Sequence, residues 1–287
     1  MALTFSTKQL HAIQLGALKR QRLIAVATKA ATPSAISRYP HTYIYGPPGL
    51  GKTFTVDQAI EKTNIPFYKV VGATSLFAFG VELAVFNYLD KVSSKIIISV
   101  DDCDAILDSP KECDVIKNVL SGMRAFKHTK NMSAQMSSFT SIQKEAIEAH
   151  STDDHMGYEV PCDRFVFVFT SNFKLPTDDD VLNARARGGS GIKKIAGQNA
   201  IRSRCQTNDF DMDWEEQWGW ISDVILNTQC LDVYNVTNED RIIILDWLYN
   251  NWKNLKERSI RTAEKMAELM VQYPDNYKDA WITDYIK

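Results

Sequence analysis

A glycine-rich stretch with one lysine and one threonine is the clearest chemical signature in the sequence. Residues 46–53 read Gly-Pro-Pro-Gly-Leu-Gly-Lys-Thr and fill every fixed position of the pattern G-x-x-x-x-G-K-[ST]. Glycines let the backbone fold tightly around a phosphate, with several N–H groups pointing inward. Lys52 would reach the β- and γ-phosphates, and the hydroxyl of Thr53 would hold Mg²⁺. The pattern therefore predicts a site for a nucleoside triphosphate.

The segments on both sides of this stretch suit a phosphate-binding loop. Thr42–Tyr45 is aromatic and β-branched, like a buried strand, and Thr53–Lys62 contains no Gly or Pro and is predicted to be helical. A helix N-terminus adds its partial positive charge to a phosphate site. A glycine-rich turn without a ligand is the alternative, and the filled pattern in this context argues against it. The predicted nucleotide-binding residues are Gly46, Pro47, Pro48, Gly49, Leu50, Gly51, Lys52, Thr53 and Phe54.

Acidic residues follow a second predicted strand. Lys95–Val100 runs directly into Asp101 and Asp102. Asp101 would lie near the coordination shell of Mg²⁺, and Asp102 would polarise the attacking water. Acids that simply end a strand are common, but the pairing with the glycine-rich loop favours a triphosphatase site. After the predicted strand Arg164–Thr170, Asn172 could orient the same water, although Asn in this position is often only a turn former.

The composition is that of an ordinary globular protein. The chain has 287 residues, of which 45% are hydrophobic and 24% charged, and fits one large domain or two modest ones. No apolar run is long enough to span a membrane, and Met1–Ser6 does not resemble a secretion signal. We expect a cytoplasmic protein with reduced thiols and no zinc site, because no C-x-x-C spacing occurs among Cys103, Cys113, Cys162, Cys205 and Cys230.

Alternating strands and helices predict an α/β fold with a parallel sheet covered by helices on both faces. A leading helix is expected at residues 7–31, and the strands are expected at Thr42–Tyr45, Phe67–Val71, Lys95–Val100 and Arg164–Thr170. Residues 127–161 read as an insertion with a short helix at Ser141–His150. From Trp214 onward only helices are predicted, at Trp214–Asn227, Asn238–Leu255, Ile260–Tyr273 and Tyr277–Ile286. The expected parts are an N-terminal helical segment (1–34), a nucleotide-binding domain (35–212) and a small helical domain (213–287).

Taken together, these residues resemble the AAA+ ATPase family over about residues 35–275. The resemblance implies a P-loop NTPase fold followed by a helical lid, with ATP and Mg²⁺ as cofactors. Asp101-Asp102-Cys103-Asp104-Ala105 looks like the family's second acidic motif, usually Asp-Glu-x-Asp, and Asn172 stands at the first sensor position. Asp102 is one methylene shorter than the usual Glu. We therefore expect that ATP binding is intact and that hydrolysis is slower, or that Asp104 also helps to activate the attacking water.

The resemblance also assigns roles to arginines. Ile201–Cys205 looks like the segment that carries the arginine finger, which reaches the γ-phosphate held by a neighbouring subunit. Arg204 is the first choice and Arg202 the second, with a surface ion pair as the alternative role. A finger implies a homo-oligomer, here expected to be a hexameric ring. Ser259–Thr262 resembles the second-sensor helix, with Arg261 as the sensor and Arg258 as its rival.

Two segments suggest what such a ring would act on. Ser75–Val81 resembles a pore loop in which Phe79 and Gly80 would contact an unfolded peptide or a base, and the alternative is that these residues belong to the core. Residues 183–194 combine four cations with Gly and Ser. They could contact nucleic-acid phosphates, or form a solvated loop.

Three functions remain open. The first is a ring ATPase that remodels or threads a protein substrate, presented directly or by an adaptor protein. The second is a DNA-replication ATPase of the clamp-loader or helicase-loader type, which Ser203-Arg204-Cys205 resembles. The third is an ATP-binding switch with weak hydrolysis, suggested by Asp102.

Overall fold

The computed structural model describes residues 4–32, 40–72, 75–102, 104–121, 125–129, 133–151, 157–189 and 191–287. It divides into two compact units. The helical unit comprises residues 1–25, 46–55 and 210–287, and the sheet unit comprises residues 26–45 and 56–209. The expected boundaries had placed residues 46–53 with the sheet. Here residues 46–55 are grouped with the helical unit.

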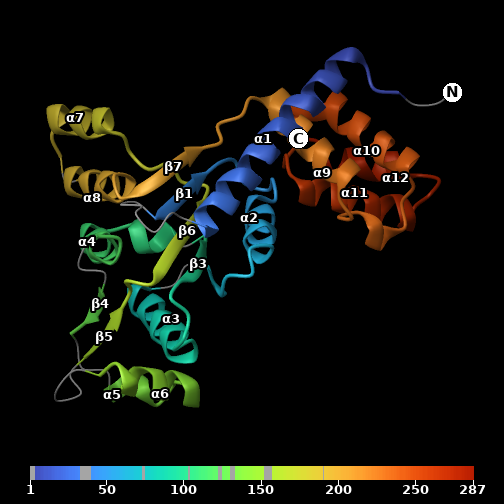
Figure 1. The fold of residues 1–287 in the computed structure, drawn as a ribbon. Coiled ribbons are helices and arrows are strands. Elements are labelled where there is room, and N and C mark those ends of the chain that lie inside the picture. The colour runs from blue at the N-terminus through green and yellow to red at the C-terminus, as the bar shows by residue number, and fades with distance from the viewer. Residues whose placement is uncertain are drawn as a thin grey trace. The chain divides into compact units, whose positions relative to one another are not determined.

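A parallel sheet forms the centre of the sheet unit (Figure 1). Its strands lie in the order β2-β3-β6-β1-β7, so the first strand is inserted between the last two. They are β1 (His41–Tyr45), β2 (Phe67–Val71), β3 (Ile96–Asp101), β6 (Phe165–Ser171) and β7 (Cys205–Asp209). The predicted fold class is confirmed, and the four predicted strands are present. The fifth, β7, is a strand that the sequence did not reveal.

The middle of the sheet is buried on both faces. In β3 and β6 every residue from Ile96 to Val100 and from Phe165 to Ser171 is buried. Such continuous apolar runs are typical of parallel strands that are covered on both sides. The pairing places Asp101 opposite Thr170 and Ile44 opposite Thr170 on the other side, so the carboxyl ends of these strands meet at one edge.

Five helices of the described chain pack around this sheet. They are α2 (Lys52–Glu61, whose first residues belong to the helical unit), α3 (Leu76–Leu89), α4 (Pro110–Val119), α7 (Asp178–Arg187) and α8 (Ile192–Arg202). Helix α4 begins with a capping box between Ser109 and Glu112, and α7 with one between Thr177 and Asp180. A short 3₁₀ helix, Asp104–Leu107, follows β3.

The insertion contains a hairpin that was not predicted. Strands β4 (Ala125–His128) and β5 (Tyr158–Pro161) pair antiparallel, with α5 (Ser133–Met136) and the predicted helix α6 (Ser141–Ala149) between them. Residues 130–132 and 152–156 of the insertion lie outside the described residues.

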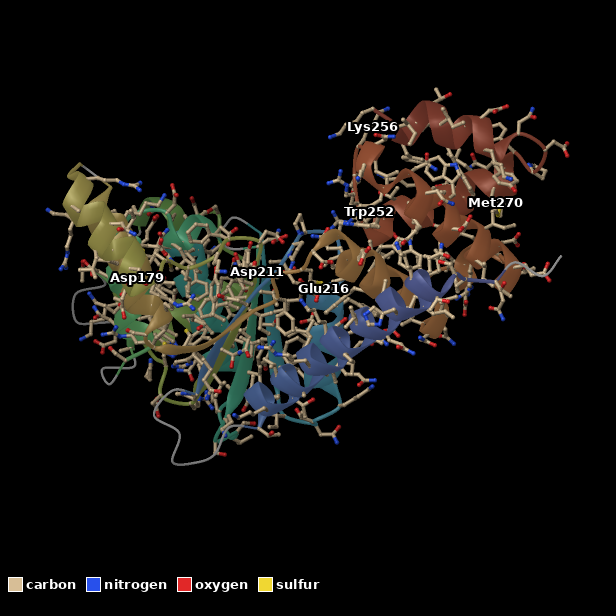
Figure 2. All side chains as sticks on the ribbon, turned by 90° about the horizontal axis from the view of Figure 1, so that it is seen from above. Asp179, Asp211, Glu216, Trp252, Lys256 and Met270 are labelled. Atoms are coloured by element: carbon tan, nitrogen blue, oxygen red, sulfur yellow. The ribbon has the colours of Figure 1, made fainter. Side chains whose placement is uncertain are left out.

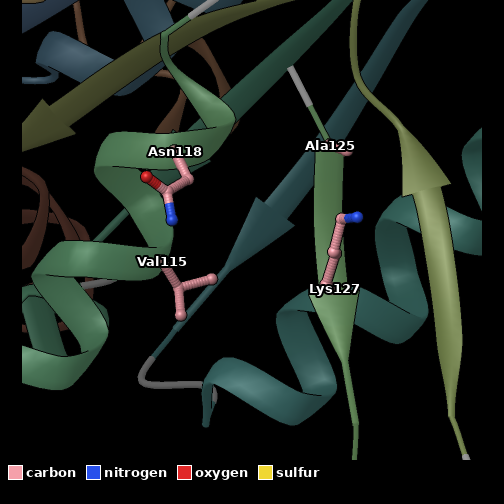
Figure 3. A pocket seen from close by; sticks show the side chains of 4 residues that line it. All are labelled: Val115, Asn118, Ala125 and Lys127. Atoms are coloured by element: carbon pink, nitrogen blue, oxygen red, sulfur yellow. The ribbon is translucent and has the colours of Figure 1, made fainter. Parts of the chain in front are cut away.

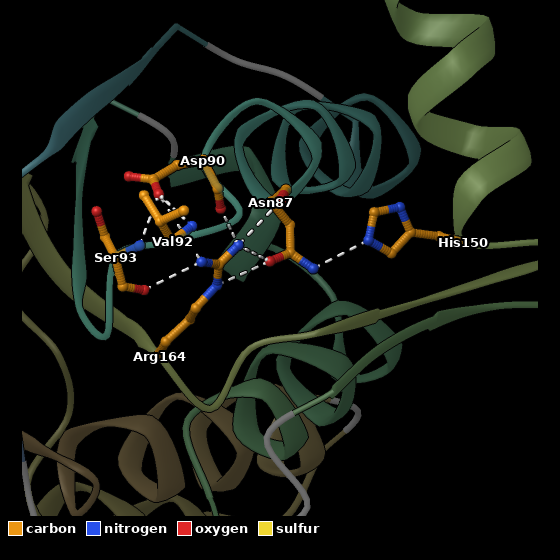
Figure 4. Close-up of polar contacts among 6 residues, drawn as sticks. All are labelled: Asn87, Asp90, Val92, Ser93, His150 and Arg164. Atoms are coloured by element: carbon orange, nitrogen blue, oxygen red, sulfur yellow. Dashed lines mark hydrogen bonds and ion pairs between the residues drawn. The ribbon is translucent and has the colours of Figure 1, made fainter.

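A polar network centred on Asn87 of helix α3 connects this helix to Arg164 and to His150 of the insertion (Figure 4). The Arg164 guanidinium donates to the Asn87 side-chain oxygen at 2.9 Å and to the Ser93 carbonyl at 3.1 Å. The Asn87 side-chain nitrogen lies 2.9 Å from Nε2 of His150, the residue that ends α6. Charged hydrogen bonds of this kind fix the geometry of partly buried side chains.

The helical unit contains α1 (Thr7–Ala31, up to residue 25), α9 (Trp214–Asn227), α10 (Asn238–Asn251), α11 (Ile260–Gln272) and α12 (Tyr277–Tyr285). The 3₁₀ turns Asp232–Tyr234 and Trp252–Asn254 connect them. Trp252 and Met270 are buried among these helices (Figure 2). Each predicted C-terminal helix is present with the predicted first residue. No helix in the described part of the chain has the length and apolarity needed to cross a membrane.

Candidate functional site

The glycine-rich stretch folds as a tight loop directly before helix α2. Gly49 has φ +73° and Gly51 has φ +69°, which is left-handed backbone that favours glycine. Helix α2 then begins at Lys52 and runs for ten residues. The first N–H groups of a helix have no partner within the helix, so the loop and the helix start together present backbone donors. This geometry fits a phosphate group. We call residues 46–53 the phosphate loop.

Two helices of the helical unit hold the phosphate loop by its carbonyl groups. The backbone N–H of Ile260, the first residue of α11, donates to the Gly49 carbonyl at 2.8 Å. The indole N–H of Trp220 in α9 donates to the Leu50 carbonyl at 2.7 Å. In a trans peptide the C=O and the following N–H point in opposite directions. The N–H groups of Leu50 and Gly51 therefore point away from these two helices.

The packing leaves no space for a side chain at Gly49. A Cβ there would lie 2.3 Å from the Cβ of Ser259, the N-cap of α11. At Gly46, a Cβ would lie 3.1 Å from the Lys52 Cδ and 3.2 Å from the Phe210 Cβ. The glycines of the pattern thus serve both the backbone conformation and close contact with the helical unit.

Lys52 lies over the phosphate loop. Its side chain is buried, at 7% exposure, and its ammonium donates to the Pro47 carbonyl at 2.7 Å. A buried ammonium among backbone groups is well placed to exchange such a contact for a phosphate oxygen. Thr53 is partly buried, whereas Phe54 is 59% exposed.

The acidic residues stand at the carboxyl edge of β3 and β6. Asp101 accepts a hydrogen bond from the Thr170 hydroxyl at 2.7 Å. Asp102 is exposed, has φ +49°, and accepts from the Asn172 side-chain amide at 3.3 Å. The Ser171 hydroxyl donates to Asp104 at 2.5 Å. The structure therefore brings the predicted acids and the predicted sensor Asn172 together within the sheet unit, whereas Cys103 lies outside the described residues.

A further polar cluster beside these strands was not predicted. Asp57 in α2 accepts from the buried Ser99 hydroxyl of β3 at 3.0 Å and forms an ion pair with Lys69 of β2 at 2.5 Å. It connects one helix to two strands. The only sequence signal was a single serine inside the isoleucine run that forms β3.

The candidate finger residues lie on either side of the end of helix α8. Arg202 donates to the Leu175 carbonyl at 3.1 Å and lies 3.6 Å from the carboxylate of Asp209. Arg204 folds back onto α8 and donates to the Ala200 carbonyl at 2.7 Å, and its Nε has no hydrogen-bond partner. Among the described residues, Arg202 thus pairs with the carboxylate of Asp209, whereas the Arg204 guanidinium contacts the Ala200 carbonyl and the Ser203 hydroxyl.

The two arginines predicted as candidates for the second sensor, Arg258 and Arg261, differ in their side-chain contacts. Arg258 donates to the carbonyls of Trp252 at 2.9 Å and Lys253 at 3.1 Å. Arg261 is exposed in the first turn of α11, one residue after the amide that contacts Gly49. Burial raises the pKa of Glu264, and the nearby positive charge of Arg261 partly lowers it again. Of the two, Arg261 is the one attached to the element that contacts the phosphate loop.

The pore-loop interpretation of Phe79 is wrong. Phe79 lies inside helix α3 with 0% exposure, and its ring lies 6.4 Å from that of Phe126 and 6.2 Å from that of Phe167. A Cβ at Gly80 would lie 2.1 Å from the Phe126 ring. Both residues fill the core between α3 and its neighbours, so they cannot grip a substrate. This agrees with the alternative that Phe79 and Gly80 belong to the core.

The buried cysteines are part of the protein core. Burial raises the pKa of the Cys113 thiol to about 11 and those of Cys162 and Cys205 to about 12, so these thiols stay protonated at neutral pH. Within the described ranges no group of three His, Cys, Asp or Glu side chains forms a metal cluster.

A small hollow lies between α4 and β4, lined by Val115, Asn118, Ala125 and Lys127 (Figure 3), and none of the predicted site residues lines it.

Part of the sequence is similar to a known protein family. Residues 42–182 match the model of the ATPase family associated with various cellular activities, AAA. No curated protein matches the sequence. The matched region contains most of the parallel sheet, the phosphate loop, the acids after β3 and Asn172. By this match, residues 42–182 form a domain of the AAA family of ATPases.

Proposed function

We propose that the chain binds and hydrolyses ATP with Mg²⁺ at the phosphate loop. The observation that carries this proposal is the loop itself: Gly49 and Gly51 have left-handed backbone, and the amides of Leu50 and Gly51 face away from the helices that hold their carbonyls. Backbone donors arranged in this way, next to a helix N-terminus and a buried lysine, suit the charge of a triphosphate.

Each residue of the site has a distinct proposed role. Lys52 exchanges its contact with the Pro47 carbonyl for the β- and γ-phosphates. The Thr53 hydroxyl and the Asp101 carboxylate are oxygen ligands of the kind that Mg²⁺ prefers, and Thr170 orients the Asp101 carboxylate. When bound, Mg²⁺ would neutralise charge on the phosphates.

We assign Asp102 as the residue that accepts a proton from the attacking water, with Asn172 beside it. The exposed carboxylate of Asp102 can reach a water, and its contact with Asn172 orients it. Asp104 is the alternative base, although its carboxylate is already engaged by Ser171. Arg261 is proposed as the sensor of the γ-phosphate from α11.

We further propose a homo-oligomeric ring in which Arg204 acts on the nucleotide of a neighbouring subunit. Its contacts are with the neutral Ala200 carbonyl and Ser203 hydroxyl, and a charged phosphate oxygen could replace them. Such a ring, expected to be hexameric, would remodel a protein or protein assembly. Because Phe79 is buried, the grip on the substrate must come from other residues.

A DNA-replication role is the second candidate, and one observation favours it. Arg185 and Arg187 at the end of α7, and Lys193 at the start of α8, are all exposed on one helical hairpin. Exposed cations of this kind suit phosphate contacts with nucleic acid.

Phosphate release from ATP by the purified chain tests these alternatives. With Mg²⁺ present, release that rises on assembly supports the ring ATPase. Release that rises several-fold with DNA, and loses this stimulation in an Arg185→Ala/Arg187→Ala variant, supports the second candidate. Binding of ATP without measurable release in the assembled oligomer would make the chain a nucleotide switch.

A further inference from the structure

Two tryptophans of helix α9 are equally buried, but their indole N–H groups contact different elements. Trp218 and Trp220 both have 0% exposure. The indole N–H of Trp218 donates to the Leu245 carbonyl in α10 at 3.0 Å. That of Trp220 donates to the Leu50 carbonyl in the phosphate loop at 2.7 Å. Trp218 therefore connects α9 to α10, whereas Trp220 connects α9 to the phosphate loop.

The Leu50 carbonyl is a sensitive position for such a contact. Leu50 is fully buried, and its carbonyl shares a peptide group with the N–H of Gly51. Rotation of this peptide group would turn the Gly51 N–H away from a bound phosphate. Because Gly49 and Gly51 on either side have few steric limits, the loop conformation depends on external contacts. The indole of Trp220 provides one of them.

Helix α1 and Phe210 hold Trp220 in place. At Gly16 of α1 a Cβ would lie 2.1 Å from the backbone nitrogen of Trp220, and at Gly219 a Cβ would lie 1.8 Å from the Ala12 carbonyl. The two helices thus cross in backbone contact. The Phe210 ring meets the Trp220 ring edge-on at 6.4 Å and also lies next to Gly46.

Polar contacts lock the same helix crossing. Lys19 of α1 donates to the Asp211 carbonyl and to the Glu216 carboxylate, both at 2.7 Å. Asp211 precedes α9 and Glu216 lies in its first turn; both are labelled in Figure 2. Arg20 forms an ion pair with Asp223 at 2.6 Å. Helix α9 therefore has little freedom to move against α1, and its indole is a fixed support.

We propose that Trp220 is a positioning residue of the nucleotide site: its indole N–H holds the Leu50 carbonyl so that the neighbouring loop amides face the phosphates. The inference rests on the proposed nucleotide binding at the phosphate loop. It predicts that the affinity for a nucleotide depends on a buried side chain of α9 that contacts no phosphate itself.

The test compares Trp220→Phe with Trp218→Phe in the full chain. Each change keeps a buried ring and removes one N–H, so the two variants should lose similar stability in urea unfolding. Titration calorimetry with MgADP should show an affinity roughly five- to tenfold weaker for Trp220→Phe than for Trp218→Phe, as the loss of one buried hydrogen bond implies. Equal affinities of the two variants would overturn the proposal.

A second measurement needs no change at Trp220. In protein labelled with ¹⁵N at its indoles, MgADP should shift the Trp220 N–H resonance, whereas the Trp218 resonance, identified by its absence in Trp218→Phe, should stay in place. Shifts of equal size for both would also overturn the proposal. If the unchanged chain binds no MgADP, the proposed function fails. If it binds and the variants do not differ, only the role of Trp220 fails.

Discussion

The side-chain amide of Asn172 donates a hydrogen bond to the carboxylate of Asp102 across 3.3 Å, at the edge where β3 and β6 end. The two residues lie 70 positions apart in the chain. Asp102 is held in left-handed backbone, an uncommon conformation for a residue with a Cβ, and such outliers occur often at functional sites. Its carboxylate is thus oriented by a neighbour and exposed to water.

Asp102→Asn should abolish most ATP hydrolysis and leave ATP binding intact. The amide cannot accept a proton, and the loss of a positioned base lowers rates by about 10²- to 10⁴-fold. Phosphate release and calorimetric binding of MgATP measure the two properties. Asp104→Asn is the matched control, since its partner is the Ser171 hydroxyl. A larger loss in Asp104→Asn than in Asp102→Asn would transfer the role to Asp104.

Arg204→Ala should bind ATP normally and fail to hydrolyse it, because the arginine acts on a neighbouring subunit. Mixing it with equally inactive Lys52→Ala subunits should restore part of the phosphate release. In such mixtures an intact loop from one subunit meets an intact Arg204 from another. Arg202→Ala, whose parent side chain pairs with Asp209, serves as the comparison. No recovery in any mixture would argue against action between subunits.

Phe79→Ala should destabilise the chain by roughly 3–5 kcal/mol, because removal of a fully buried ring leaves a cavity in the core. Urea unfolding measures the change in the free energy of unfolding. Phe54→Ala removes an exposed ring and should change it by only about 0.5 kcal/mol. An effect of Phe79→Ala as small as that of Phe54→Ala would show that Phe79 is not in the core.

The buried cysteines should make the fold less stable at alkaline pH. Burial raises the pKa of the Cys162 thiol from its usual value of 9.0 to about 12, so the folded state favours the protonated thiol. This stability is fully present below pH 9 and is lost as the pH rises toward 12. Between pH 7.5 and pH 10 the loss is roughly 1 kcal/mol for this thiol. Urea unfolding at both pH values should show a smaller difference in Cys162→Ala, and an unchanged difference would contradict the assignment.

The sequence predicted those parts of the fold that local signals determine. The caps Asp213, Thr237 and Ser259 lie directly before helices that begin at the predicted residues. The phosphate loop was recognisable because its glycines follow from its backbone geometry. Strand β7, in contrast, reads Cys-Gln-Thr-Asn-Asp and has no apolar alternation. It is a strand only because β1 lies beside it.

Contacts between distant residues account for the rest. The hydrogen bond from Trp220 to Leu50 joins residues that are 170 positions apart, and no local pattern indicates it. The pore-loop prediction for Phe79 failed for the same reason, because local sequence does not reveal contacts between distant residues. An aromatic residue before Gly suits either an exposed loop or a packed helix, and packing against distant residues such as Phe126 and Phe167 decides between them.

Calorimetric titration of MgATP into the chain and into its Lys52→Ala variant tests the central claim most directly. Lys62→Ala, which removes an equal charge from an exposed position just after α2, is the matched control. Loss of a charged hydrogen bond to phosphate should weaken binding roughly 10- to 100-fold in Lys52→Ala and leave Lys62→Ala unchanged. Equal affinities for the chain and Lys52→Ala would contradict nucleotide binding at residues 46–53.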